Sequence, residues 1–148
     1  MKIQQLSVFL ENRPGAIRTP CRALASAGIN ILTLSLADTQ QFGILRLIVK
    51  DWQKAKQVLQ QAHCVVNVHE VVAVDVADRP GGLADLLDLL GESKLGIEYM
   101  YAFTAGPRGG GKASMIFRFE EPDKAIKALA ERGVNAIAPS ELFARLGE

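Results

Sequence analysis

The chain has 148 residues, 49% of them hydrophobic and 22% charged, which is typical of a soluble globular protein and excludes a disordered or collagen-like chain. Its net charge of +1 gives no basic surface for nucleic acid, and its apolar runs are far shorter than the ~20 residues of a membrane span. The first residues lack the apolar core of a signal peptide, so we expect a cytoplasmic protein.

The first half of the chain predicts elements in the order βαββαβ. Residues 3–10 alternate between apolar and polar side chains, as in a strand with one buried face. Ile17, Leu24 and Ala27 recur at helical spacing, and Gly28 is a typical residue at a helix end. The remaining elements expected here are strands at 29–37 and 44–49 joined by a hairpin at 38–41, a helix at 52–62 and a strand at 64–68.

The second half predicts the same order of elements. They are strands at 70–76, 97–104, 114–119 and 134–137, with helices at 82–93 and 123–132. Ser140 is a favourable N-cap, so a last helical turn is expected around Leu142 and Phe143.

An internal duplication explains why the two halves agree. Asn12-Arg13-Pro14-Gly15 matches Asp78-Arg79-Pro80-Gly81, 66 positions later. Ala27-Gly28-Ile29-Asn30 matches Leu95-Gly96-Ile97-Glu98 at a shift of 68, and Lys54-Ala55 matches Lys124-Ala125 at a shift of 70. The shift grows only between elements, where insertions are tolerated.

The duplicated order predicts an α+β protein made of two ferredoxin-like βαββαβ units, residues 1–69 and 70–148. Each unit is expected to have an antiparallel four-stranded sheet with its two helices on one face. Units of ~70 residues have barely enough core to be stable alone, so pairing of units, within the chain or in a homodimer, would add stability.

Several motifs in the sequence lack the accompanying residues that their usual chemistry requires. The segment 106–112 has the G-x4-G-K spacing of a phosphate-binding loop, but Ala113 replaces the Ser or Thr that binds Mg²⁺ and a strand follows, so a hairpin loop is expected. Cys21 and Cys64 are expected to be buried, reduced thiols. His63 and His69 lack the spacing of metal ligands, and no nucleophile-and-base pattern is present. We therefore expect no metal, no cofactor and no catalysis.

The Arg-Pro-Gly turn has a chemistry suited to anions. If a helix starts there, the amides of Gly15, Ala16 and Ile17 are free to bind a carboxylate, and Asn12 adds a donor and an acceptor. Asn30, just inside the next strand, is expected to face the same spot. The alternative is a tight turn in which Asn12 caps the helix.

The segment 6–17, followed by 27–31, resembles an ACT domain, and the resemblance recurs at 78–83. It covers essentially the whole chain and is closest in layout to small stand-alone proteins made of an ACT domain pair. The resemblance implies a ferredoxin-like fold, amino acids bound where two such domains meet, and a role in regulating metabolism.

The resemblance also implies which residues bind the effector. Asn12 and Asn30 would hold it, together with main-chain groups of the turn at 15–17; a His of the family is replaced by Leu10. A possible second site would contain Asp78, Gly81, Gly82, Leu83 and Glu98. There, carboxylates replace both Asn residues and would repel a carboxylate but attract an ammonium group.

Pro20 departs from the family pattern, because it stands where the first helix should already be under way. A late start, with Thr19 as N-cap and Pro20 as the first helical residue, would leave residues 15–18 as a loop.

The sequence thus predicts a non-catalytic, homodimeric regulatory protein that binds an amino acid or a similar small effector. Aspartate-family, branched-chain and aromatic amino acids are all candidates. One alternative is a regulatory subunit acting on a separate amino-acid biosynthetic enzyme, as in the acetolactate synthase small subunits, which lack the second Arg-Pro-Gly turn. Another is a structural pairing module with degenerate sites.

Overall fold

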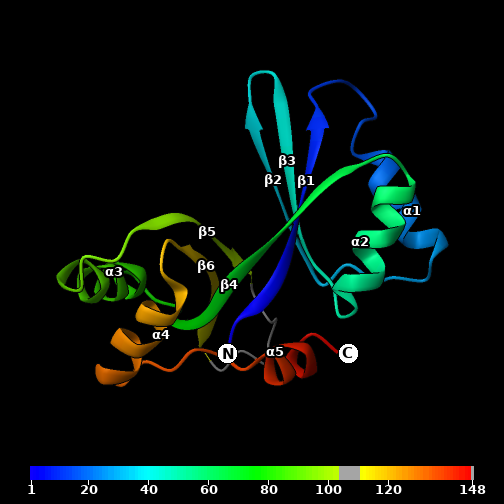
Figure 1. Ribbon diagram of the computed structural model, residues 1–148. Coiled ribbons are helices and arrows are strands. Elements are labelled where there is room, and N and C mark those ends of the chain that lie inside the picture. The colour runs from blue at the N-terminus through cyan, green and yellow to red at the C-terminus, as the bar shows by residue number, and fades with distance from the viewer. Residues whose placement is uncertain (104–110, 148) are drawn as a thin grey trace. The chain divides into compact units, whose positions relative to one another are not determined.

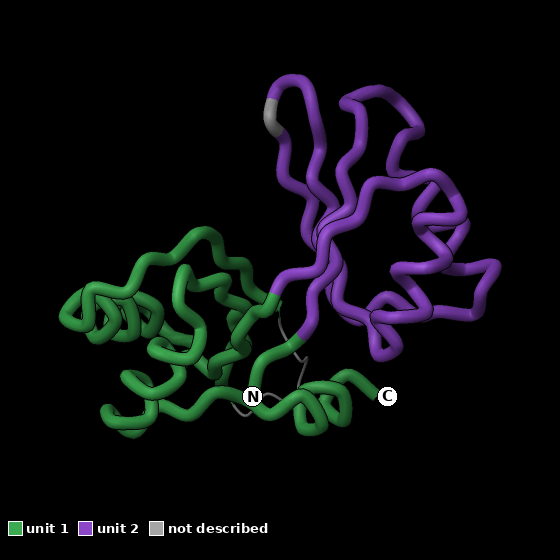
Figure 2. The backbone as a smooth tube through the Cα atoms, viewed as in Figure 1, with its two compact units in different colours: residues 1–3, 70–148 green, residues 4–69 purple. Residues whose placement is uncertain are grey.

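The computed structural model describes residues 1–103 and 111–147, which divide into two compact units (Figure 2). Residues 4–69 form the N-terminal unit, and residues 70–148 with Met1–Ile3 form the C-terminal unit. Met1–Ile3 belong to the latter, where the Lys2 ammonium lies 2.9 Å from the Glu70 carboxylate and 3.1 Å from that of Asp123. The boundary falls inside one long strand, β4 (Val65–Ala77).

The N-terminal unit has the strand order β2-β3-β1-β4. Its strands are β1 (Ile3–Glu11), β2 (Thr33–Thr39), β3 (Phe42–Ile48) and the first part of β4. Helices α1 (Arg18–Ser26) and α2 (Trp52–Gln61) cover one face of this sheet (Figure 1). The alternation in β1 turns Leu6 and Val8 toward the helices, where they pack with Leu24 and Leu59 in a fully buried core.

The C-terminal unit repeats this arrangement with β4, β5 (Ile97–Phe103) and β6 (Lys112–Phe119), in the order β4-β6-β5. Helices α3 (Gly82–Glu92) and α4 (Pro122–Glu131) pack over a core that contains Val74 and Phe117. The α+β class and the tandem ferredoxin-like units are therefore confirmed.

The prediction of residues 134–137 as the fourth strand of this unit is wrong. It is reduced to a single bridge between Val74 and Ala136, with the Ile137 amide donating to the Ala73 carbonyl at 2.8 Å. The Val134 amide instead donates to the Leu129 carbonyl at the end of α4, and Pro139 soon begins another helix, so too few residues remain for a ladder. Among the described residues of this unit, the sheet thus has three full strands rather than four.

The last helix, α5 (Pro139–Arg145), begins one residue before the predicted cap. Its N-cap is Ala138 and Pro139 is the first helical residue, because the ring fixes a helical φ and the missing N–H is not needed there. Ser140 is therefore not the N-cap. Leu142 is fully buried, and Arg145 pairs with Asp75, whose side chain points away from the Val74 core. This pairing places α5 on the sheet face opposite to α3 and α4.

Both cysteines are free thiols, but they are half-buried rather than buried as expected. Within residues 1–103 and 111–147, no helix is long and apolar enough to cross a membrane.

Candidate functional site

The first Arg-Pro-Gly turn is bordered by two pockets, which share Leu10, Glu11, Arg13 and Ala16. The smaller, about 180 Å³, we call the Asn12 pocket; its other lining residues are Asn12, Ile17, Leu36, Ala37, Asp38 and Gly43. The larger, about 470 Å³, we call the Phe42 pocket; its other lining residues are Phe9, Thr19, Phe42, Ala62, His63, Cys64 and Val65. The predicted turn therefore lies at a concave surface, as a binding site requires.

Asn12 ties the end of β1 to the β2–β3 hairpin. Its side-chain amide donates to the Asp38 carboxylate at 3.2 Å and to the Gln40 carbonyl at 3.3 Å. The N-cap of α1 is Ile17, with no side-chain hydrogen bond to the cap, so the alternative in which Asn12 caps the helix is wrong.

The main chain of the turn is partly engaged. Gly15 has φ of +82°, the Ala16 amide donates to the Arg13 carbonyl at 3.2 Å, and the Arg18 amide donates to the Gly15 carbonyl at 3.0 Å. No described residue accepts a hydrogen bond from the amide of Gly15 or Ile17. Of the three amides predicted to be free, two therefore stay open to a ligand.

Pro20 is the third residue of α1, and the predicted late start with Thr19 as N-cap is wrong. The first hydrogen bond that reaches back four residues at this end of the helix runs from the Cys21 amide to the Ile17 carbonyl. Pro20 thus lies among the positions whose N–H has no partner inside the helix, and it costs no hydrogen bond there.

Asn12 and Asn30 are at opposite ends of the same sheet. Glu11, next to Asn12, faces Phe42 at the start of β3, whereas the Leu32 amide, close to Asn30, donates to the carbonyl of Ile48 at the end of β3. Six residues of extended chain separate these ends, roughly 20 Å. Within this unit the two side chains do not meet.

The second copy has the same separation. Ala77, next to Asp78, faces Lys112, and Ile97, next to Glu98, faces Phe119 at the other end of β6. The Glu98 carboxylate accepts a hydrogen bond from Nε of Arg118 at 3.1 Å, which compensates its charge.

The glycines of the second turn have structural roles. Gly81 has φ of +87°, close to that of Gly15. A Cβ on Gly82 would lie 2.0 Å from the Ala77 carbonyl oxygen, so α3 starts directly at Gly82 in close contact with β4. Leu83 packs against the hydrophobic core. Ala16 takes the place of Gly82 in the first copy, and α1 starts two residues later, at Arg18.

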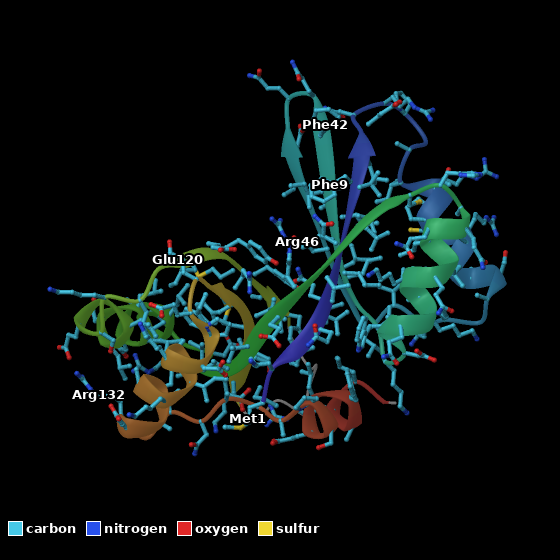
Figure 3. The ribbon with its side chains drawn as sticks, viewed as in Figure 1. Met1, Phe9, Phe42, Arg46, Glu120 and Arg132 are labelled. Carbon is cyan, nitrogen blue, oxygen red and sulfur yellow. The ribbon has the colours of Figure 1, made fainter. Side chains whose placement is uncertain are left out.

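Charged and titratable groups surround the Phe42 pocket. Nε of Arg13 lies 2.8 Å from the Glu11 carboxylate, and both side chains are exposed. His63 has φ of +59°, and burial raises the pKa of the Cys64 thiol. Sequence reasoning missed this pocket, although Phe9 is an aromatic residue inside the predicted strand 3–10 and Phe42 is another directly after the predicted hairpin at 38–41 (Figure 3).

A third pocket, about 400 Å³, which we call the Asp75 pocket, lies in the C-terminal unit. It is lined by Asp75, Lys112, Glu141, Arg145 and residues 133–137. Oδ1 of Asp75 accepts hydrogen bonds from the Ser114 hydroxyl at 3.0 Å and from Arg145 at 2.9 Å.

The described part of the chain contains no cluster of three or more His, Cys, Asp or Glu side chains suited to a metal. Most of the predicted loop at 106–112 lies outside the described residues. Lys112 begins β6, so a strand and not a helix follows the G-x4-G-K spacing, as predicted.

Comparison with known proteins finds a family model described as ACT domain pair, which matches residues 1–146. Protein BT0572 from Bacteroides thetaiotaomicron is 38% identical in its crystal structure, with 97% of this chain and 96% of that chain covered and a TM-score of 0.87. The ligand-free regulatory subunit of aspartate kinase from Thermus thermophilus is 18% identical, with 86% and 91% covered and a TM-score of 0.61, which shows a shared fold. No protein of curated function matches.

Proposed function

Since the chain belongs to the family of ACT domain pairs, as its sequence resemblance predicted, we propose that it is a regulatory protein that binds a free amino acid at its first Arg-Pro-Gly turn. The observation that carries this proposal is the meeting of Asn12 and Ile17 at a pocket beside the turn. Amides and a side-chain amide at a helix start suit a carboxylate.

In this proposal the amides of Gly15 and Ile17 donate to the ligand's carboxylate, beside Asn12 and Ala16. Asp38, which also lines the Asn12 pocket, would attract the ammonium group. Because Asn30 lies at the far end of the sheet, it contributes only if a second copy of the unit supplies it. We therefore propose a homodimer.

The second turn is a weaker site in this view. Glu98 already has Arg118 as its partner, Leu83 packs against the core, Gly81 supplies the positive φ of the turn, and Gly82 allows the close packing of α3 on β4. Asp78 would add a repulsive carboxylate. We propose that the C-terminal unit binds no amino-acid carboxylate at Asp78.

Calorimetry with each of the twenty amino acids tests the proposal. We expect at least one of them to bind, and we expect the N12A and N30A variants to lose that binding. N30A should lose it because the second copy in the dimer would no longer supply the side chain that completes the site. Asn67, an exposed residue of β4 in the same unit, provides the control: N67A should bind as the original chain does. A folded protein that binds none of the twenty would contradict the proposal.

A second candidate is regulation of a separate enzyme. The aspartate kinase regulatory subunit from Thermus thermophilus has the same fold over most of this chain, and it is by name a subunit of another enzyme. Affinity purification of the tagged chain from its own cells, with and without the amino acid found by calorimetry, would test this. Recovery of a large biosynthetic enzyme subunit would support it, and recovery of the tagged chain alone would contradict it.

A further inference from the structure

The Phe42 pocket and the Asp75 pocket occupy overlapping positions in the two copies. Glu11 faces Phe42 in the first ladder, and Ala77 faces Lys112 in the second, which is the register that the repeat predicts. His63 and Gly133, which line the two pockets, both have positive φ, and each follows the end of a helix, α2 and α4 respectively. The duplicated fold therefore forms a pocket at this position in each unit.

The lining of the two pockets differs in polarity. Phe9, Phe42 and Val65 of the first pocket correspond to Asp75, Lys112 and Asn135 of the second. The fold itself tolerates charged and polar residues at these positions, so the apolar lining of the Phe42 pocket is not a requirement of folding.

The apolar residues also contribute little to the core. Phe42 is 52% exposed and Val65 is 64% exposed, so neither gains the stability that full burial would give. Phe9 of β1 lies on the same sheet face as Phe42 (Figure 3). It faces Ile44, which is two residues from Phe42 along β3. Exposed apolar side chains gathered in a concave surface are typical of a ligand site.

The two pockets also differ in what lies over them. In the C-terminal unit, Arg145 and Glu141 of α5 supply a wall with a positive and a negative group. In the N-terminal unit the chain continues along β4 after Val65, and the described residues 4–69 contain no helix equivalent to α5. Paired charges are present instead on Arg13 and Glu11, at the mouth that the Phe42 pocket shares with the Asn12 pocket.

We propose that the Phe42 pocket receives the side chain of a large apolar amino acid, aromatic or branched-chain, while its carboxylate and ammonium groups stay at the turn, where Arg13 and Glu11 add a positive and a negative charge to the groups of the proposed site. An exposed ion pair has a small free energy, so exchanging its partners for those of a zwitterion costs little. The volume of about 470 Å³ lies in the range of small-ligand pockets. This inference rests on the proposed function and narrows its ligand.

The first experiment compares affinities. Phenylalanine and leucine should bind more tightly than aspartate, lysine or threonine. The F42K and V65N variants introduce the residues that the second copy carries, and each should weaken binding of phenylalanine about tenfold or more. Leu34 is 55% exposed on β2 and lines neither pocket, so L34K is the matched control and should bind normally.

The second experiment uses the two free thiols of the chain. Cys64 lines the Phe42 pocket and Cys21 does not, while both are half-buried. Saturating phenylalanine should slow alkylation of Cys64 by iodoacetamide several-fold and leave the rate at Cys21 unchanged, as measured by peptide mass spectrometry.

The outcomes separate this inference from the proposed function. Tightest binding of a polar amino acid, or binding of phenylalanine that neither protects Cys64 nor responds to F42K and V65N, would overturn the inference alone. Binding of no amino acid by the folded protein would overturn both.

Discussion

Arg145 and Asp75 form a two-bond ion pair between the last helix and the long strand β4. Nη1 of Arg145 lies 2.9 Å from Oδ1 and 3.0 Å from Oδ2 of the Asp75 carboxylate. The hydrogen bond to Asp75, followed by that to Glu141, raises the pKa of Arg145 above its ordinary value, so the guanidinium stays charged. The pair links the end of α5 to the sheet, in addition to the burial of Leu142.

Replacing Arg145 by Met should lower the free energy of unfolding by about 2 kcal/mol, because it leaves the Asp75 carboxylate, only 19% exposed, without its charged partner. Urea denaturation would measure the change. K127M removes a well-exposed ion pair with Glu131 and should cost less than about 0.5 kcal/mol. Equal effects of the two variants would contradict the role given to Asp75.

Gly82→Ala should destabilise the protein by about 3 kcal/mol, since the new Cβ would lie 2.0 Å from the Ala77 carbonyl oxygen and α3 would have to move. At Gly91, near the end of the same helix, an added Cβ would have no atom within 4 Å apart from its chain neighbours and the nearby backbone of its own helix. There the same substitution should stabilise by up to about 1 kcal/mol. Thermal unfolding of both variants tests the argument, which fails if G82A melts no lower than G91A.

Pro20→Ala should change stability by no more than about 1 kcal/mol, and in the destabilising direction. Pro20 is buried in the first turn of α1, where its missing N–H has no acceptor, so the substitution loses some apolar contact and the proline's restriction of the unfolded chain. A23P in the same helix should cost about 3 kcal/mol. A large gain in stability from P20A would show that the proline strains the helix.

Native Cys64 should become reactive toward iodoacetamide at higher pH than in the urea-unfolded chain, because burial raises its pKa. The stability that the protein gains from this raised thiol pKa of Cys64 is therefore complete below the ordinary thiol pKa, about 8.5, and is lost as pH rises through the higher native pKa. The C64S variant should lack this part of the pH dependence. Identical alkylation profiles in native and unfolded protein would contradict the effect of burial.

Local patterns were sufficient for most elements of the fold. The alternation of Leu6 and Val8, the helix stop at Gly28 and the repeated Arg-Pro-Gly turn each act within a few residues, so a sequence reading captures them. The errors lie where two local demands compete. Val134 had strand propensity, but the end of α4 took its amide, and Pro139 displaced Ser140 from the cap.

The sequence predicted only part of the candidate site. Asn12 was expected beside the turn, at the strand end, and in the structure it lines a pocket there. Asn30 was expected to face the same spot, but the antiparallel order of β1, β3 and β2 puts it at the other end of the sheet. The Phe42 pocket joins β1, the start of β3 and the end of α2, segments that no local pattern connects.

The sequence by itself determined the duplication, the α+β class and the family, because periodicity, turn residues and motifs are properties of neighbouring residues. Only the tertiary structure decided which residues line the pockets beside the first turn, which carboxylate has a charged partner and which apolar residues remain exposed. Those depend on strand register and on contacts between residues far apart in the chain, such as Glu11 with Phe42 and Asp75 with Arg145. The two Arg-Pro-Gly turns thus share one backbone conformation at Gly15 and Gly81 but have different surroundings.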